Sequence, residues 1–377
     1  MAPELLTPAR AGADHHGQPS HSSYRDWELG CPFSLAGGMA DHMIAGPARR
    51  WAEDLLPHLR SARLDRVVYS FTVFGAMVAA QSVGVSFGVL IPNIYPMPTP
   101  SQPPMGMVLS PSQTFVGRGR DRLLGEIGTR MLAHYVMPRL NALRRDLDLP
   151  QLRNAWQQVH GARRELVLSS HAFDIANNCD STVRYVDPML DDPGWAHSHH
   201  SVEPRGEGPL ILVAMSSAEQ GQLGVLQNVI EALSILPVRA VVTTGLSIDL
   251  CDLSGGARVE IVRAAPHHDL MTHTGLVITH GGHGTVMKSL TAGLPMVILP
   301  QGRDQADNAV LVSLRGAGIT LPRDAPAGQI THAVVEALKL PGYSKAARML
   351  GEAIRHEVAG SNLVSELEPS YGDTVNA

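Results

Sequence analysis

The feature that most constrains this sequence is a strand that runs into a glycine-rich turn, a short helix and a second strand. Residues 276–279 (LVIT) and 296–300 (MVILP) are apolar runs that predict buried strands of a parallel sheet. Between them, residues 280–285 (HGGHGT) permit a tight turn, and the helix predicted over 285–291 ends before a Gly-Leu-Pro stop. This order predicts an α/β fold with an anion site, because the free N–H groups of the turn and the positive end of the helix favour a phosphate.

The order of residues in this stretch closely resembles the nucleotide-sugar signature of family 1 glycosyltransferases. Within that family it looks most like the bacterial branch that decorates antibiotics, lipids and other small molecules. The resemblance covers roughly residue 50 to the C-terminus and is dense from about 210 to 322. It implies a GT-B fold, with two Rossmann-like domains facing each other. It also implies inverting transfer of a hexose from a UDP- or TDP-sugar to a hydroxyl of a small hydrophobic acceptor.

The resemblance further implies a set of donor-binding residues. The positions that match diphosphate contacts of the family lie in two turns: Ser216, Ser217, His280, Gly282, Gly284 and Thr285. Asp304 and Gln305 match the acidic–amide pair that contacts the transferred sugar, since a polyol needs side chains that accept and donate hydrogen bonds. A loop-capping role for Asp304 is the alternative, and Asn308 is a further candidate for the same pocket.

The sequence predicts no metal site. His280 and His283 have the HxxH spacing of some zinc sites, but a glycine-rich turn does not hold both rings on one face of a helix. The resemblance implies that a helix N-terminus, rather than a divalent metal, holds the diphosphate. It implies no cofactor, because the nucleoside-diphosphate sugar is a co-substrate.

Several positions depart from the family pattern. Lys288 replaces the glutamate that usually holds the ribose, and Ala264 stands where many relatives have a tryptophan stacked on the base. We find no N-terminal strand, Gly-His loop and helix that would carry the catalytic histidine, and Ser70 replaces its aspartate. The N-terminal domain is therefore expected to be truncated, and the catalytic residues are unknown. An inactive nucleotide-sugar-binding or accessory protein and a sugar-nucleotide epimerase remain as alternatives.

The chain divides into five expected segments. These are an atypical or disordered N-terminal segment (1–47), a partial acceptor-binding Rossmann-like domain (48–190), a linker (191–208), a nucleotide-sugar-binding Rossmann-like domain (209–355) and a tail or crossing helix (356–377). The first domain opens with an amphipathic helix over 48–60. The uncharged stretch 67–92 is as long as a membrane span, but polar residues and glycines interrupt it, so we predict a strand–helix–strand unit.

Two segments of the first domain bear on the acceptor and on membranes. Tyr95, Met97 and Met105 fall in a loop rich in Pro and Met that in this fold shapes the acceptor pocket, although packing alone also explains such residues. Residues 115–149 alternate Arg with Leu and Met, as a helix on a membrane surface can. Acidic residues offset these arginines, so we expect a solvated surface helix.

Composition limits the partners and the compartment. The net charge of −5 argues against nucleic acid as the main partner. The three cysteines are far apart and show no metal or redox spacing, and no signal peptide is evident, which favours a reducing, cytoplasmic setting.

Overall fold

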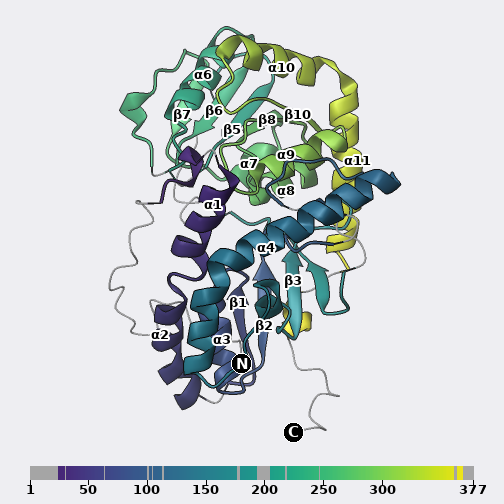
Figure 1. Cartoon of the computed structure of the whole chain (residues 1–377). Helices are drawn as coiled ribbons and strands as arrows, with labels where there is room; N and C mark the ends of the chain where they lie inside the picture. The colour runs from purple at the N-terminus through teal and green to yellow at the C-terminus, as the bar shows by residue number, and fades with distance from the viewer. Residues whose placement is uncertain are drawn as a thin grey trace.

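The structure is a computed structural model. It describes residues 24–367, except residues 30, 63, 100–101, 104, 113, 176–178, 193–203, 217–218, 246 and 361–362. Two α/β domains are stacked in Figure 1, the N-terminal one below the C-terminal one. Each is built on a parallel sheet, so the predicted α/β class is confirmed.

The N-terminal domain has a four-stranded sheet in the order β1-β2-β3-β4. Its strands are β1 (Val67–Ser70), β2 (Phe87–Ile91), β3 (Arg164–Leu168) and β4 (Val183–Val186), and its helices are α2 (Ala48–Ser61), α3 (Phe74–Ser82), α4 (Phe115–Asp146) and α5 (Trp156–Val159). The stretch 67–92 forms the predicted strand–helix–strand unit, with β1 parallel to β2. A Cβ at Gly75 would lie 1.8 Å from the Ala48 carbonyl oxygen, so glycine lets α3 and α2 pack backbone against backbone.

The segment before α2 contains helices that the sequence analysis did not predict. It forms η2 (Asp26–Glu28), α1 (Pro32–Met39) and the π-helical turn η3 (Ala40–Ile44). The segment 1–47, expected to be atypical or disordered, is therefore helical over 26–28 and 32–44. Ala36, Ala40 and Ile44 are buried, and this burial stabilises a segment whose small, glycine-rich sequence has weak helix propensity.

The C-terminal domain has a six-stranded sheet in the order β10-β9-β8-β5-β6-β7. Its strands are β5 (Leu210–Ala214), β6 (Arg239–Thr243), β7 (Val259–Val262), β8 (Thr274–Thr279), β9 (Met296–Ile298) and β10 (Gly318–Thr320). Its helices are α6 (Leu223–Ser234), η5 (Leu250–Asp252), α7 (His267–Met271), α8 (His283–Thr291), α9 (Gln305–Leu314), α10 (Ala327–Lys339) and α11 (Pro341–Val358). The strand order reverses between β5 and β8, and ligands of open α/β sheets bind at the carboxyl ends of the strands beside such a reversal.

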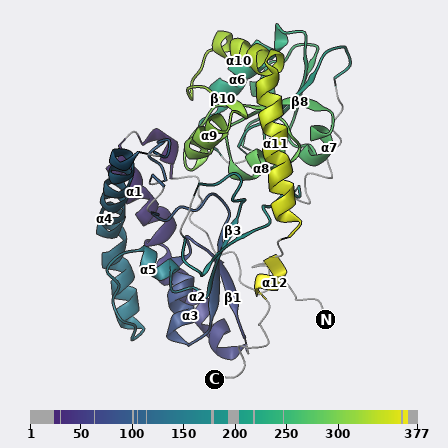
Figure 2. The ribbon, with the colours of Figure 1, turned by 90° about the vertical axis from the view of Figure 1, so that its right-hand side faces the viewer.

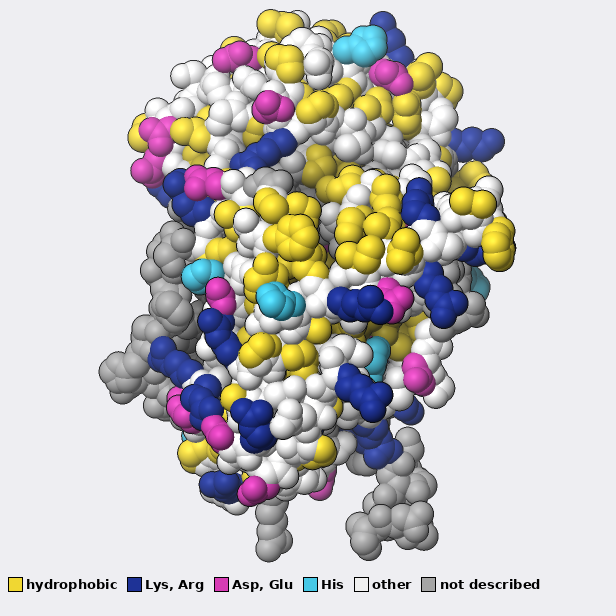
Figure 3. All heavy atoms as spheres, in the orientation of Figure 1, with side chains coloured by type: hydrophobic (Ala, Val, Ile, Leu, Met, Phe, Trp, Pro, Cys, Tyr) yellow, Lys and Arg dark blue, Asp and Glu magenta, His cyan; other side chains and the backbone are white. Residues whose placement is uncertain are grey.

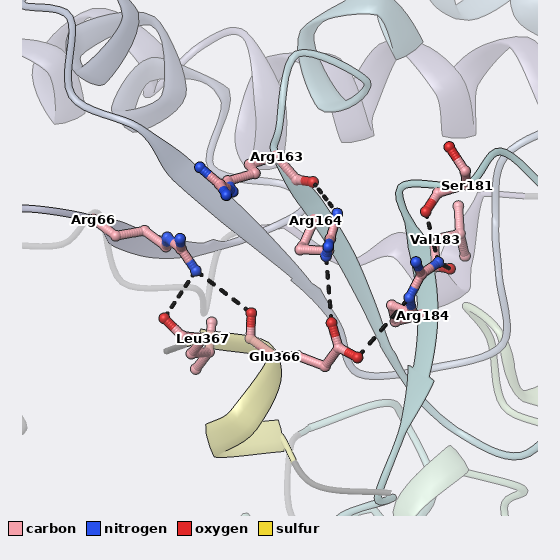
Figure 4. A network of polar contacts seen from close by, with 8 residues as sticks. All are labelled: Arg66, Arg163, Arg164, Ser181, Val183, Arg184, Glu366 and Leu367. Carbon is pink, nitrogen blue, oxygen red and sulfur yellow. Dashed lines mark hydrogen bonds and ion pairs between the residues drawn. The ribbon is translucent and has the colours of Figure 1, made fainter. Parts of the chain in front are cut away.

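The chain returns to the N-terminal domain after α11, as Figure 2 shows. The short helix α12 (Leu363–Leu367) lies against β3 and β4 through Leu363 and Leu367. Arg66 donates to the carbonyl oxygen of Leu367 at 2.8 Å, and Arg164 contacts the Glu366 carboxylate at 3.3 Å (Figure 4). None of the helices in the described part of the chain is long and apolar enough to span a membrane.

Candidate functional site

A pocket of about 340 Å³ opens at the reversal of strand order in the C-terminal sheet. Residues that follow β5, β6, β7 and β8 form it, together with the first turns of α8. Five of the six predicted diphosphate contacts line it: Ser216, His280, Gly282, Gly284 and Thr285. Ser217, the sixth, lies outside the described residues. The two turns, more than sixty residues apart in the sequence, thus meet at one corner.

The backbone of the turn between β8 and α8 requires glycine. Gly281 has φ of 90°, and a Cβ there would lie 2.9 Å from the Gln305 carbonyl oxygen. A Cβ at Gly282 would lie 2.5 Å from Nε2 of His280, so the ring packs directly over the backbone at this position. The N–H groups at the N-terminus of α8 consequently face the pocket without side-chain cover.

His280 is buried, and its ring is neutral near pH 7. Its Nδ1 donates to the Ala214 carbonyl oxygen at 3.4 Å, which leaves Nε2 for a ligand. Burial lowers the pKa of His280 to about 4, with the positive charge of Arg303 acting in the same direction. An anion at Nε2 would be bound best by the protonated ring, so binding of a phosphate here would be coupled to proton uptake.

His283 joins the two domains. Its Nε2 donates to the Leu168 carbonyl oxygen at 3.1 Å, at the carboxyl end of β3, and its ring lies beside Phe173. Burial lowers its pKa. The two histidines therefore lie in different surroundings: His280 lines the pocket, and His283 anchors α8 to the N-terminal domain. Within the described ranges no three His, Cys, Asp or Glu residues are grouped to hold a metal ion.

A buried ion pair forms one wall of the pocket. Lys288 donates from Nζ to Oδ1 of Asp192 at 2.6 Å, and the His268 N–H donates to Oδ2 at 2.8 Å. Burial works to raise the pKa of Asp192, but these hydrogen bonds and the charge of Lys288 outweigh it and hold that pKa below its usual range. Helix α8 has no carboxylate at position 288, but Asp192, in the segment leading into the linker, places one beside Lys288. Sequence reasoning missed Asp192 because nothing local in the sequence marks it.

Other residues of the lining were not predicted as ligands. Nε2 of His267 and Oγ1 of Thr243 form a hydrogen bond of 3.1 Å. Burial lowers the pKa of His267 to about 4. Ala264 lies in the lining beside Gly245, so this end of the pocket is walled by small residues. A nucleobase beside Ala264 would lack the aromatic stacking partner that a tryptophan provides.

The predicted sugar-binding pair lies on the neighbouring loop, outside the lining of this pocket. Gln305 accepts from the Gln301 and Gly302 N–H groups at 2.7 and 3.2 Å and donates to Gln220 at 3.0 Å, so its amide closes the loop. Asp304 accepts from the Asn308 amide at 3.0 Å. Their contact with sugar stays a prediction.

The three predicted acceptor residues lie in different surroundings. Tyr95 and Met97 are buried in the core of the N-terminal domain, where Tyr95 donates to the buried Glu165 carboxylate at 3.0 Å. Met105 is half-buried and packs against the core of the C-terminal domain. Beside it, Asp307 on α9 accepts from the Gly106 N–H at 2.6 Å, which ties this loop to the C-terminal domain. Met105 is therefore the only one of the three at the junction of the domains.

Known proteins share these features. Residues 228–368 match the family model described as the C-terminal domain of erythromycin biosynthesis protein CIII-like proteins. The 4'-demethylrebeccamycin synthase of Lentzea aerocolonigenes is 27% identical over 322 residues, 84% of this chain and 76% of that protein. The glycosyltransferase of kitacinnamycin superposes with a TM-score of 0.69 at 21% identity, covering 90% and 84% of the two chains. The spinosyn rhamnosyltransferase SpnG complexed with thymidine diphosphate gives 0.64 at 18%, covering 91% and 83%.

The two facing parallel-sheet domains, with a pocket at the strand-order reversal, define a GT-B fold. Together with the model matched over residues 228–368 and the glycosyltransferases that the chain resembles in sequence, they support a glycosyltransferase of the bacterial, antibiotic-type branch of family 1.

Proposed function

We propose that this protein transfers a hexose from a UDP- or TDP-sugar to a hydroxyl of a hydrophobic small molecule, with inversion at the anomeric carbon. The observation that carries the proposal is the convergence of Ser216, His280 and the α8 N-terminus on one pocket. The acceptor oxygen would form its bond to the anomeric carbon as the bond to the diphosphate oxygen breaks. The corner would stabilise the negative charge that the leaving diphosphate gains.

The donor would lie with its diphosphate at the His280 corner and its nucleoside toward the far wall. The Lys288–Asp192 pair stands where ribose hydroxyls would be expected, and Asp192 retains oxygen lone pairs that can accept from them. The transferred sugar would then extend toward Asp304 and Gln305, at the junction where the Met105 loop meets α9.

One observation favours a second function, that of a nucleotide-sugar-binding protein without transferase activity. Ser70 ends β1 where a catalytic partner would be expected, and its Oγ lies 3.4 Å from the Thr72 hydroxyl on the protein surface. A hydroxyl there does not orient a base as a carboxylate does. Donor binding would be preserved in this case, since the pocket lies in the other domain.

A paired binding and turnover experiment separates these possibilities. We expect UDP or TDP to bind in calorimetry, and donor sugar plus a panel of hydroxylated aromatic acceptors to give glycosides detectable by mass spectrometry. His280→Ala should weaken diphosphate binding by about 1–3 kcal/mol, because one charge-assisted contact is lost. Binding without glycosides would support the inactive alternative. Donor conversion without an acceptor would indicate an epimerase, and absence of binding would contradict the donor site.

A further inference from the structure

The N-terminal half of α4 exposes a row of large apolar side chains to solvent. Relative exposure reaches 87% for Phe115, 80% for Val116, 59% for Leu123 and 48% for Ile127. Val116, Leu123 and Ile127 are spaced by seven and four residues, so they lie on one side of the helix. Figure 3 shows hydrophobic side chains gathered across the middle of this face, where α4 runs in Figure 1. We call these four residues the α4 apolar row.

Arginines accompany the row. Residues 115–130 contain four arginines against Asp121 and Glu126, which leaves two surplus positive charges. Arg120 is paired with Asp121 and Arg130 with Glu126, at 2.6 Å each. Arg118 and Arg122 are exposed and have no hydrogen bond or ion pair with any residue that the structure describes. Aromatic and aliphatic side chains flanked by unpaired arginines are the composition of helices that lie in the interface of an anionic membrane.

We propose that the α4 apolar row docks this protein on anionic lipid membranes. Phe115 and Leu123 would enter the boundary between headgroups and acyl chains, while Arg118 and Arg122 contact lipid phosphates. Charge complementarity favours this occupant over a second copy of the chain, because a symmetric pair would bring the arginines of both copies together. The predicted solvated surface helix is thus reconsidered: the arginines are offset only in part, and the apolar side chains stay uncovered.

The helix is held firmly enough to act as a platform. Thr114 caps α4 by accepting from the Gly117 N–H at 3.1 Å, and the Asp121 carboxylate is buried against the preceding loop. Arg120 donates to the Ser110 carbonyl oxygen of that loop at 3.2 Å. Because Asp307 binds the same loop from the other domain, the row lies beside the interdomain junction. An acceptor dissolved in the membrane would enter there. This last consequence depends on the proposed transferase function, whereas docking itself does not.

Vesicle co-sedimentation without donor or acceptor tests the docking. The probes are vesicles of phosphatidylcholine alone and of equal parts phosphatidylcholine and phosphatidylglycerol. We expect the full chain to sediment with the anionic vesicles, less so at high salt, and weakly with phosphatidylcholine. Leu123→Glu with Ile127→Glu should reduce the partition coefficient by about tenfold or more, because two apolar groups that would enter the membrane become charged. Arg118→Gln with Arg122→Gln should remove most of the preference for anionic lipid.

A matched control replaces apolar residues of similar exposure elsewhere. Ile235→Glu with Met349→Glu alters side chains that are 73% and 61% exposed on the C-terminal domain, and it should sediment like the wild type. All these positions are exposed, so unchanged thermal unfolding would show that the variants fold. Equal sedimentation of all variants, or none with anionic vesicles, would overturn the proposal. So would a dimer in sedimentation velocity that the Leu123→Glu, Ile127→Glu variant abolishes, since the row would then belong to a second copy.

Discussion

His280 shows how a single buried ring can couple ligand binding to a proton. Burial keeps its pKa at about 4, so the free protein at neutral pH has an unprotonated Nε2 facing the pocket. A diphosphate beside Nε2 raises that pKa, because the charged ring gains an opposite charge. We therefore expect UDP binding near pH 7 to take up a proton and to weaken as the pH rises through the pKa of the complex.

Calorimetry in two buffers of different ionisation enthalpy measures this uptake directly. His280→Gln keeps a hydrogen-bond donor but cannot titrate, so its binding enthalpy should be the same in both buffers and its affinity nearly independent of pH. Equal enthalpies for the wild type would contradict the coupling, even if UDP binds well.

Cys31 and Cys179 should differ in reactivity because their surroundings differ. Cys31 is exposed, and the N–H groups of Ser34 and Phe33 at the start of α1 lower its pKa. Burial raises the pKa of Cys179 to about 11. At pH 7.5 iodoacetamide should alkylate Cys31 well before Cys179, as peptide mass spectrometry would show. In the Cys31→Ser variant the exposed Cys251 should be the remaining cysteine that reacts fast, whereas a Cys179 that reacts as fast as Cys31 would contradict this account.

Local chemistry made some residues predictable and others not. The glycines at 281 and 282 could be assigned from the sequence, because a tight turn between strand and helix needs them wherever it occurs. Asp192 could not, since its role arises only when the segment after β4 folds against α8. The closing role of the Gln305 amide likewise depends on Gln301 and Gln220, which reach it only in the folded loop.

At the scale of elements, the pattern of apolar residues predicted those strands and helices whose buried faces follow that pattern. The strands predicted at 276–279 and 296–300 match β8 and β9 to within two residues at each end, because uninterrupted apolar strands have clear ends. Helix α1 was missed because its glycine-rich sequence gives no amphipathic pattern, and burial of alanines stabilises it instead.

Helix α12 offers a test at this scale. The Glu366 carboxylate contacts Arg164 at 3.3 Å and Arg184 at 3.9 Å, each partly exposed. Solvent screening limits the gain, so Glu366→Gln should lower the free energy of unfolding by less than about 1 kcal/mol. It should nevertheless speed hydrogen exchange in α12, since short helices depend on such docking contacts.

Glu352→Gln is the matched control, because Glu352 is exposed on α11 with no ion pair to any described residue. Added salt should shrink the difference between the two variants. Unchanged exchange in α12 for Glu366→Gln at low salt would show that apolar contacts of Leu363 and Leu367 hold it alone.

At the scale of the whole molecule, the two domains shift the pKa values of their histidines in opposite directions. The C-terminal pocket contains buried His267 and His280, whose pKa values lie near 4. In the N-terminal domain, the hydrogen bond from His160 to the buried Glu165 raises the pKa of His160. Histidines with a lowered folded pKa favour the native state above the unfolded value of about 6.5, and this stability is lost as the pH falls toward 4. For His160 the stabilisation is complete below about 6.5 and is lost as the pH rises through its raised pKa.

Acidification from pH 7.5 to 5.5 should therefore act oppositely on the two domains. His267 and His280 then each favour unfolding by about 1 kcal/mol, and His283, whose pKa is also lowered, acts in the same direction. Asp307, whose burial raises its pKa to about 6, offsets about 1 kcal/mol of the total. Hydrogen exchange, with times corrected for the intrinsic rate at each pH, should show less protection in β8 and α8 and more in β3 and β4. His160→Gln should abolish only the N-terminal gain. Parallel loss in both domains would mean that the junction through His283 and Leu168 makes them unfold as one unit.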